Sequence, residues 1–376
     1  MKKLLMISCV YMDDEYSGIT RKVKSYYRAF EKQYDTWLVA YQQGEVGVWH
    51  NGKVRTMPNK NPYKKAGLIM AVRKLIEEQN FDYVYIRRLA CNFYVMSLLK
   101  KMKETNRIKS ILWEIPTYPY DFEDHSPIEK IENCLDKRWR KHLKKYVDRI
   151  VTFSEDSSIF GIPCIRLENG IDIEEISVRK PHKQEDDEIH LIAVAVLHDW
   201  HGYDRLLEGM GQYYKNNGEK KIYFHLVGDG PAKSQYEELI EKYGLQKFVK
   251  IYGYLSPQES AKIYDECDIA IESLAWHRIH VKIGSTLKVR EYLAKGMPIF
   301  ASSPMDVVPK EWEYAAYAPI DDSPIDIASV IAFYKKIYGE KTQEEVIKEI
   351  RQFAMEHCDI NRTLNRIVEY WRNKYE

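Results

Sequence analysis

The sequence predicts an α/β protein built of two doubly wound, Rossmann-like domains. Short apolar runs rich in β-branched residues alternate with helix-like segments, and this alternation occurs in two series. A charged, proline-containing segment, Ser177–Glu188, separates the series. At 376 residues, the chain is long enough for two domains. We expect one domain at 1–182 and the other at 183–357.

Each expected strand is an apolar run, and a helical pattern follows most of them. The expected strands are Leu4–Val10, Thr36–Ala40, Tyr83–Ile86, Ser110–Glu114, Arg149–Ser154 and Cys164–Leu167 in the first series, and Ile189–Val196, Ile222–Gly228, Val249–Gly253, Ile269–Ser273 and Pro298–Ala301 in the second. The expected helices are Ile19–Lys32, Lys64–Gln79, Ile128–Tyr146, Gly202–Asn217, Lys233–Tyr243, Pro257–Asp265, Thr286–Ala294 and Ser323–Tyr338, followed by a helical tail at Gln343–Glu376.

Composition excludes several classes of protein. The hydrophobic fraction of 45% is too high for a disordered chain, and no apolar run is long enough to cross a membrane. The six cysteines contain no Cys-x-x-Cys pair, which argues against a zinc site or disulfide framework and suits a reducing cytosol. Residues 1–180 carry 32 Lys and Arg against 24 Asp and Glu, so the first half is basic and the second acidic. A basic half suits an anionic surface or a phosphate-bearing partner, and a chance uneven distribution of solvated lysines is the alternative.

Two segments of the second series suggest a phosphate-binding site. In the first, the expected strand Ile222–Gly228 runs into the turn Gly228-Asp-Gly230-Pro231 and then a helix. Such a turn lets a ligand approach the backbone, but a strand-to-helix turn without a ligand would also explain these residues. The third glycine of a nicotinamide-binding fingerprint is absent.

The second segment is a helix that opens at Ser285 or Thr286 and stops at Gly296. Lys288 and Glu291 are three residues apart near its start, so they share a face. The lysine and the first amides of the helix suit a diphosphate, and the carboxylate suits a ribose diol. A solvated ion pair is the alternative.

Four motifs together resemble one family. They are Asn169-Gly-Ile-Asp172, Val227-Gly-Asp-Gly-Pro231, Val249-Lys-Ile-Tyr-Gly-Tyr254 and Glu291-Tyr-Leu-Ala-Lys-Gly-Met-Pro298. Their order and spacing are similar to those of the family-4 retaining glycosyltransferases, the glycosyltransferase group 1 family. The resemblance implies the GT-B fold, in which an acceptor domain and a donor domain face a central cleft. It also implies that the last helix, residues 358–376, crosses back to the first domain.

The resemblance assigns roles to residues of the second domain. Glu291 would bind the ribose of a nucleotide-sugar donor, and Gly228 would let the donor lie close to the sheet. The backbone at Gly253 and Tyr254 would meet the base, and the amides of Thr286 and Leu287 would meet the diphosphate.

The chain departs from the family pattern at three positions. Val196 and His201 stand where the family has the Arg and Lys that clamp the diphosphate, and Ile283 stands where it has a Glu. Lys288, Arg278 and Arg290 are the candidates to meet the phosphate charge instead, as in a bacterial subgroup with similar substitutions, and His201 is a further catalytic candidate. An inactive homologue is the alternative.

The family mechanism is a retaining transfer that needs no covalent nucleophile, cofactor or metal. The acceptor hydroxyl would attack the face that the diphosphate leaves, and the leaving phosphate would take its proton. On the acceptor side we expect Glu114 to stand where the family has a His or an acidic residue. Arg87, Tyr118 and Gly18 are further candidates near the ends of the first-domain strands.

A basic helix, Asp136–Tyr146, carries Trp139, Leu143 and Tyr146 on one side. It would either dock on an anionic membrane or bury this stripe in the core.

The expected function is therefore retaining transfer of a hexose from a nucleotide-sugar, UDP rather than GDP, to a glycan or lipid-linked acceptor in bacterial polysaccharide or glycoconjugate synthesis. We expect a cytoplasmic location with peripheral contact at the inner membrane face, and no nucleic-acid partner. A UDP-sugar 2-epimerase of the same architecture and a non-catalytic nucleotide-sugar or glycan-binding homologue are the alternatives.

Overall fold

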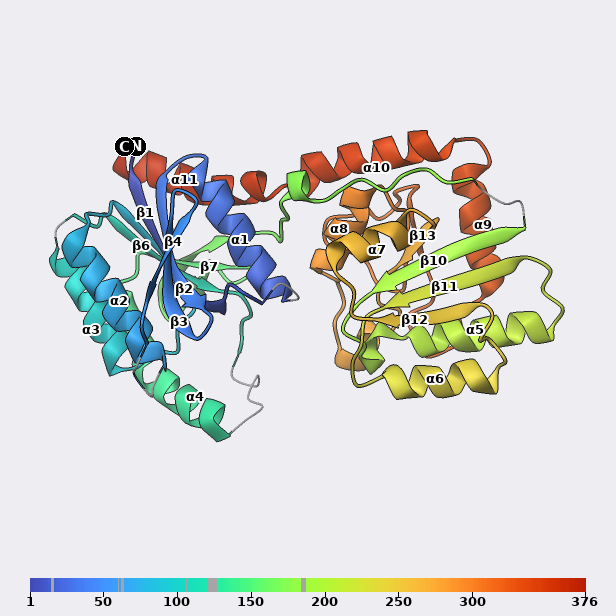
Figure 1. Ribbon diagram of the computed structural model, residues 1–376, viewed down its shortest axis with the longest axis horizontal. Helices are drawn as coiled ribbons and strands as arrows, with labels where there is room; N and C mark the ends of the chain where they lie inside the picture. Colours follow the sequence, from blue (N-terminus) through green and yellow to red (C-terminus); the bar gives the residue numbers. More distant parts are fainter. Residues whose placement is uncertain (15–16, 60, 62–63, 106, 121–126, 184–186) are drawn as a thin grey trace. The chain divides into compact units, whose positions relative to one another are not determined.

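A computed structural model describes residues 1–14, 17–59, 61, 64–105, 107–120, 127–183 and 187–376 (Figure 1). Contacts divide the chain into two compact units. Unit 1 comprises Met1–Asn169 and Ile360–Glu376, and unit 2 comprises Gly170–Asp359. Each unit has its own sheet covered by helices on both faces, as the α/β fold class predicts.

The sheet of unit 1 has nine strands in the order β4-β3-β2-β1-β5-β6-β7-β9-β8. Its central strands, from β2 to β7 and on to β9, are parallel, and β3, β4 and β8 pair antiparallel at the two edges. The strands are β1 Lys3–Tyr11, β2 Asp35–Gln42, β3 Glu45–His50, β4 Lys53–Met57, β5 Tyr83–Arg87, β6 Ser110–Ile115, β7 Arg149–Thr152, β8 Ser158–Ile159 and β9 Ile162–Arg166.

Alternate side chains of these strands feed two cores. Val84 and Ile86 of β5 face the core beneath α2 and α3, whereas Tyr83 and Tyr85 face the core beneath α1 and α11. Figure 1 shows α2 and α3 on one side of the sheet and α1 on the other. The helices of this unit are α1 Gly18–Glu31, α2 Lys64–Glu78, α3 Phe93–Glu104, α4 Pro127–Trp139, the 3₁₀ turn η1 Arg140–Lys145, and α11 Ile360–Tyr375.

The C-terminal helix α11 is packed into unit 1 by aromatic side chains. Trp371 is fully buried, and its ring stacks on Tyr83 with 4.7 Å between centroids. Phe30 and Tyr34 contact the same indole. Burial of so large a side chain accounts for the position of the last helix in this unit.

The sheet of unit 2 has six parallel strands in the order β12-β11-β10-β13-β14-β15. They are β10 Glu188–Val194, β11 Lys221–Val227, β12 Val249–Gly253, β13 Ile269–Ile271, β14 Ile299–Ala301 and β15 Ala315–Tyr317. The helices are α5 Tyr203–Lys215, α6 Lys233–Lys242, α7 Pro257–Tyr264, α8 Leu287–Lys295, α9 Ile327–Tyr338 and α10 Gln343–His357, with 3₁₀ turns η2 Ile173–Glu175, η3 Asp199–His201 and η4 Trp276–Ile279.

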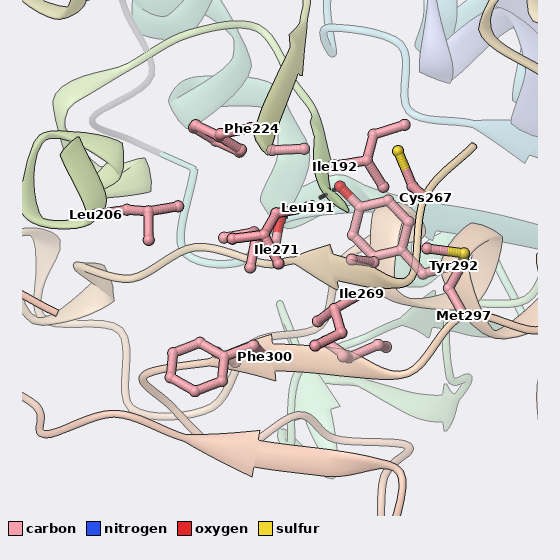
Figure 2. Packing of buried hydrophobic residues seen from close by; sticks show 14 of the residues in the cluster. Leu191, Ile192, Leu206, Phe224, Cys267, Ile269, Ile271, Tyr292, Met297 and Phe300 are labelled. Atoms are coloured by element: carbon pink, nitrogen blue, oxygen red, sulfur yellow. Dashed lines mark hydrogen bonds between the residues drawn. The ribbon is translucent and has the colours of Figure 1, made fainter. Parts of the chain in front are cut away.

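The core of unit 2 holds α8 rigidly against the sheet. Figure 2 shows Tyr292 of α8 beside Ile192, Cys267 and Met297 within the apolar cluster. The Tyr292 hydroxyl accepts from the amide of Val194, at 3.0 Å. This anchoring matters because the first turn of α8 carries the residues expected to bind a ligand.

The boundary between the units lies after Asn169, whereas the sequence placed it after residue 182. Hydrogen bonds join Ile171 and Arg179 of this segment to other parts of unit 2. The Ile171 amide donates to the Cys358 carbonyl at 2.9 Å, and the buried Arg179 guanidinium donates to the Cys267 carbonyl at 3.2 Å. A charged segment therefore looks like a linker in the sequence although its arginine is a structural part of unit 2.

Candidate functional site

The most promising site in unit 2 lies where the chain order of the sheet reverses. From β10 the chain proceeds to β11 and β12 on one side, and then returns to β13 on the other side. Ligands of parallel α/β sheets bind at this switch point, outside the carboxyl ends of the strands. The segments that leave β10 and β13 there contain residues 195–202 and 272–286.

The glycine turn after β11 is explained by close packing of the chain itself. Gly228 has a φ of 135°, and a Cβ there would lie 1.8 Å from the Ala195 carbonyl oxygen. A Cβ at Gly230 would lie 2.4 Å from the carbonyl oxygen of Leu197. These glycines are needed for the turn to pass the β10 loop, whether or not a donor approaches.

The backbone expected to meet a base lies next to this turn. Gly253 accepts from the Gly228 amide at 2.8 Å, and its φ of 71° is left-handed with open space around the Cα. Tyr254 is 59% exposed, and its hydroxyl donates to the Asp229 carbonyl at 3.3 Å. An exposed ring next to an open backbone position can stack on a planar ligand.

Thr286 caps helix α8. Its hydroxyl accepts from the Val289 amide at 3.2 Å and donates to the Glu272 carboxylate at 3.1 Å. The amides at the start of a helix, here those that follow Thr286 at Leu287 and Lys288, have no partner within the helix. The helix therefore presents donors and the positive end of its dipole at the switch point.

Lys288 lies on the first turn of α8 with its ammonium directed at the end of β13. Its Nζ is 3.4 Å from the Ser273 hydroxyl and 3.2 Å from Glu272 Oε2. The latter distance makes an ion pair, but Oε2 has no aligned hydrogen bond, and we regard the contact as a charge interaction. The Lys288 side chain is 18% exposed, so its charge is partly open to solvent. Glu291, one turn further, is half-buried.

Arg278 is held by the protein itself, contrary to its expected role at a phosphate. Its guanidinium forms a bidentate pair with Asp204, at 3.0 and 2.7 Å, and donates through Nε to Asp322 at 2.7 Å. A further bond goes to the Asp199 carbonyl at 2.7 Å. These carboxylates raise the pKa of Arg278. Because four of its five N–H groups are engaged, Arg278 is better explained as a clamp for the η4 loop.

Arg290 is also a structural residue. It is 1% exposed, and its guanidinium forms a bidentate pair with Asp306 at 2.8 and 2.7 Å. It also donates to the Thr286 carbonyl at 3.1 Å. This placement argues against the expected phosphate contact, because the cation is buried and neutralised by Asp306. Arg290 instead anchors the start of α8.

His201 cannot replace a phosphate-binding lysine by charge. Its Nδ1 accepts from the His198 amide at 3.1 Å, and its ring is buried against Tyr203. Burial, with the nearby Lys288 ammonium, lowers the pKa of His201 to about 2. The imidazole is therefore neutral at physiological pH, with an N–H at Nε2 as its remaining donor. Val196, the other substituted position, is 51% exposed.

In unit 1 the carboxylate expected on the acceptor side, Glu114, is buried. Glu114 at the end of β6 is inaccessible to solvent and forms an ion pair with Arg87, whose side chain is 12% exposed. It also accepts from the Tyr85 hydroxyl at 2.9 Å. Burial and the Glu114 charge raise the pKa of Tyr85, so the phenol stays a donor. Glu114 is thus not placed to meet an acceptor, and only the edge of Arg87 reaches solvent.

The remaining acceptor-side candidates are Tyr118, which lies in a cluster of aromatic rings, and Gly18, which begins helix α1. The ring of Tyr118 lies 5.9 Å from that of Phe160 and 6.5 Å from that of Tyr120. Gly18 is the first residue of α1, after the cap Ser17, and a Cβ there would meet nothing within 4 Å. Neither residue is brought into contact with Arg87 by any bond that the structure describes.

Three acidic residues of unit 2 were not found from the sequence: Glu272, Asp204 and Asp306. Each pairs with a cation that the sequence singled out, namely Lys288, Arg278 and Arg290. The partners lie between 16 and 74 residues apart along the chain. The one local signal is Glu272, a carboxylate directly after the apolar run of β13.

Comparisons with known proteins concern unit 2 and the fold of the chain. Residues 174–313, within unit 2, match the family model described as glycosyl transferases group 1. The chain is similar in structure to sucrose-phosphate synthase from Thermosynechococcus elongatus, with 12% identity, coverage of 99% of both chains and a TM-score of 0.65. It is also similar to a glycosyltransferase from Rickettsia africae, with 15% identity, coverage of 100% of this chain and 99% of that one, and a TM-score of 0.64.

A third similar structure is Anabaena HepE in complex with UDP, with 14% identity, coverage of 99% of this chain and 100% of that one, and a TM-score of 0.59. No curated protein matches the sequence. The architecture is therefore that of the GT-B glycosyltransferases, with two Rossmann-like units. Within the described ranges, no helix is both long and apolar enough to cross a membrane.

Proposed function

We propose that the protein is a retaining hexosyltransferase that moves a sugar from a nucleotide-sugar to a glycan or lipid-linked acceptor in bacterial polysaccharide or glycoconjugate synthesis. A UDP-sugar is favoured over a GDP-sugar, since Anabaena HepE has been crystallised with UDP and with UDP-glucose. The observation that carries the proposal is the first turn of α8 at the switch point, where Lys288 follows the Thr286 cap.

In this proposal each group has one task. The first amides of α8 and the Lys288 ammonium stabilise the negative charge that develops on the leaving diphosphate. Glu291 accepts hydrogen bonds from the ribose, and the Gly253–Tyr254 backbone borders the base. The acceptor hydroxyl attacks the anomeric carbon on the face that the diphosphate leaves, and its proton passes to the departing phosphate. No metal takes part, because the charge is met by the ammonium and the helix.

The donor site is tested by thermal unfolding with UDP, GDP, ADP and dTDP, each with and without EDTA. A ligand at 100 times its dissociation constant stabilises the folded state by about 2.7 kcal/mol. We expect UDP to raise the melting temperature most, to the same extent with EDTA. Stabilisation by none of the four would contradict the donor site. Stabilisation that EDTA abolishes would contradict metal independence.

The stereochemistry is tested by following a UDP-α-sugar by NMR. The sugar first transferred or released should be the α anomer. Release of the β anomer would show inversion, and appearance of a 2-epimer would identify an epimerase.

A non-catalytic nucleotide-sugar-binding protein is the second candidate. It is favoured by one observation: Arg278 and Arg290, two of the expected phosphate cations, are committed to Asp204 and Asp306. Such a protein would be stabilised by UDP but would leave a UDP-sugar unchanged.

A further inference from the structure

Helix α4 has the reverse of the usual amphipathic pattern. Asn133 and Asp136, three residues apart, face inward and are buried. Ile131 and Leu135, four residues apart on the other face, are 64% and 43% exposed. A surface helix normally buries its apolar stripe.

The inward polar face is explained by the fold. Asp136 accepts from the Cys91 amide at 2.7 Å and from the Tyr120 hydroxyl at 2.8 Å. Arg140 lies 3.7 Å from the same carboxylate. Hydrogen bonds within unit 1 therefore explain why Asp136 is buried. They do not explain why the apolar residues Ile131 and Leu135 are exposed.

Two further exposed apolar residues lie at the start of α3. Trp139, the last residue of α4, is partly buried against the core of unit 1, and its ring meets that of Phe93 edge-on at 6.3 Å. Phe93 and Tyr94, at the start of α3, are 64% and 55% exposed. A tyrosine such as Tyr94, whose ring is apolar and whose hydroxyl is polar, is favoured where an apolar medium meets water.

The segment that carries Ile131 and Leu135 is rich in exposed cations. Within residues 130–145, which the structure describes throughout, the two acids are Glu132, paired with Lys65 at 2.5 Å, and the buried Asp136. The same stretch has six exposed cations: Lys130, Lys137, Arg138, Lys141, Lys144 and Lys145. We name the exposed residues Phe93, Tyr94, Ile131 and Leu135 together with these six cations the α4 surface.

We propose that the α4 surface docks on an anionic lipid bilayer, with α4 lying in the interface plane. Lipid supplies both features that the surface requires: an apolar layer for Ile131 and Leu135, and a negative potential for the cations. The stripe Trp139–Leu143–Tyr146, by contrast, contributes to the core of unit 1 and does not form this surface. The inference deepens the proposed function, because a bilayer would present a lipid-linked acceptor to unit 1. Vesicle binding is measured without nucleotide, so its failure leaves the donor site untouched.

The experiment uses a fluorescent reporter on Cys134. This residue lies on α4 beside the exposed stripe, and it is the exposed one of the six cysteines. The full chain, labelled at Cys134 with an environment-sensitive dye, is mixed with vesicles of phosphatidylcholine alone or with phosphatidylglycerol added. We expect a blue shift and co-sedimentation with the anionic vesicles only, both weakened by salt.

Two double variants and two matched controls separate the parts of the surface. Ile131→Ser with Leu135→Ser should lower partitioning about tenfold. Lys137→Glu with Arg138→Glu should lower it at least about 25-fold. The controls are Met70→Ser, an equally exposed apolar residue of α2, and Lys335→Glu with Lys336→Glu, an adjacent exposed pair near the end of α9.

The controls should bind as the unaltered protein does. Absence of binding to anionic vesicles at low salt would overturn the proposal, as would equal loss in the α4 and control variants. Concentration-dependent dimerisation that Ile131→Ser with Leu135→Ser abolishes, without vesicle binding, would assign the surface to a second copy of the chain and also overturn it.

Discussion

Two buried carboxylates, one in each unit, stand at the carboxyl ends of parallel strands and face a cation. Glu114 of unit 1 pairs with Arg87 and also accepts from the Tyr85 hydroxyl, so its charge and its hydrogen bonding are met by neighbouring side chains. Glu272 of unit 2 accepts from Thr286, but its second oxygen has no hydrogen bond from the described residues and lies 3.2 Å from the Lys288 ammonium. A planar guanidinium in a closed pair is a structural element, whereas a single ammonium at an open switch point can turn toward a ligand.

The largest effect is expected for Glu114→Ala. Removing the carboxylate leaves the Arg87 charge almost buried and the Tyr85 hydroxyl without its acceptor, which should destabilise unit 1 by about 3–5 kcal/mol. Chemical denaturation of the full chain, followed by circular dichroism, measures the loss. Glu155→Ala, at a carboxylate whose side chain is 85% exposed, is the control. A stability equal to that of the control would show that the Glu114 cluster is not structural.

The next largest effect is expected for Lys288→Ala, which tests the Glu272–Lys288 pair at the switch point. If the ammonium acts on the leaving diphosphate, kcat should fall by about 10²–10³, with a smaller change in KM. Lys262→Ala, at an exposed lysine of α7, should leave both constants unchanged. A rise in KM alone would limit Lys288 to binding the ground state.

Glu291→Ala should have an intermediate effect, on binding. Loss of a charged acceptor for the ribose should weaken UDP binding by about 1.5–3 kcal/mol, measured by isothermal titration calorimetry. Glu311→Ala, at an exposed glutamate of unit 2, is the control. A ligand that lacks the ribose hydroxyls should bind both proteins equally. Unchanged UDP affinity would remove Glu291 from the donor site.

The smallest effect concerns the neutral His201. Its pKa is about 2 in the folded protein and near 6.5 when unfolded, so the unfolded chain binds more protons between these values. Stability should therefore fall as pH falls through this window, by at most about 1.4 kcal/mol per pH unit from this residue. Denaturation between about pH 5 and pH 7 measures the slope. The slope should be shallower in His201→Asn, which keeps an acceptor for the His198 amide; an unchanged slope would show that His201 titrates normally.

Much of the fold could be predicted because its signals are local. The strand Leu4–Val10 lies within β1, and the expected stop at Gly296 is observed with a φ of 79°. The hairpin β3–β4 was not anticipated, although its Asn51-Gly52 turn, with both φ angles positive, is the usual signal for one. Helix α3 was also missed, although Asn92 caps it. In β4 the first four of five residues are exposed, so this strand gives no apolar run in the sequence.

The candidate site was predictable only in part. Thr286, Lys288 and Glu291 are neighbours in the sequence, and the start of α8 places them together by helical spacing. Arg278 and Arg290 were chosen as cations that suit a phosphate, and Glu114 was chosen from the family resemblance. Each is committed to another residue in the folded chain. Charge in a motif shows that a group can bind phosphate, but not whether it is already neutralised.

The sequence by itself determined the alternation of strands and helices, the helix caps and the presence of two α/β units, because these depend on periodicity and on residues a few positions apart. The tertiary structure alone decided which charged groups remain open to a ligand. Asp204 reaches Arg278 and Asp306 reaches Arg290 only after the sheet has brought distant loops together. The tertiary structure also decided that α4 turns Asp136 inward and Ile131 outward. The groups that donate hydrogen bonds to Asp136, the Cys91 amide and the Tyr120 hydroxyl, come from other segments of unit 1.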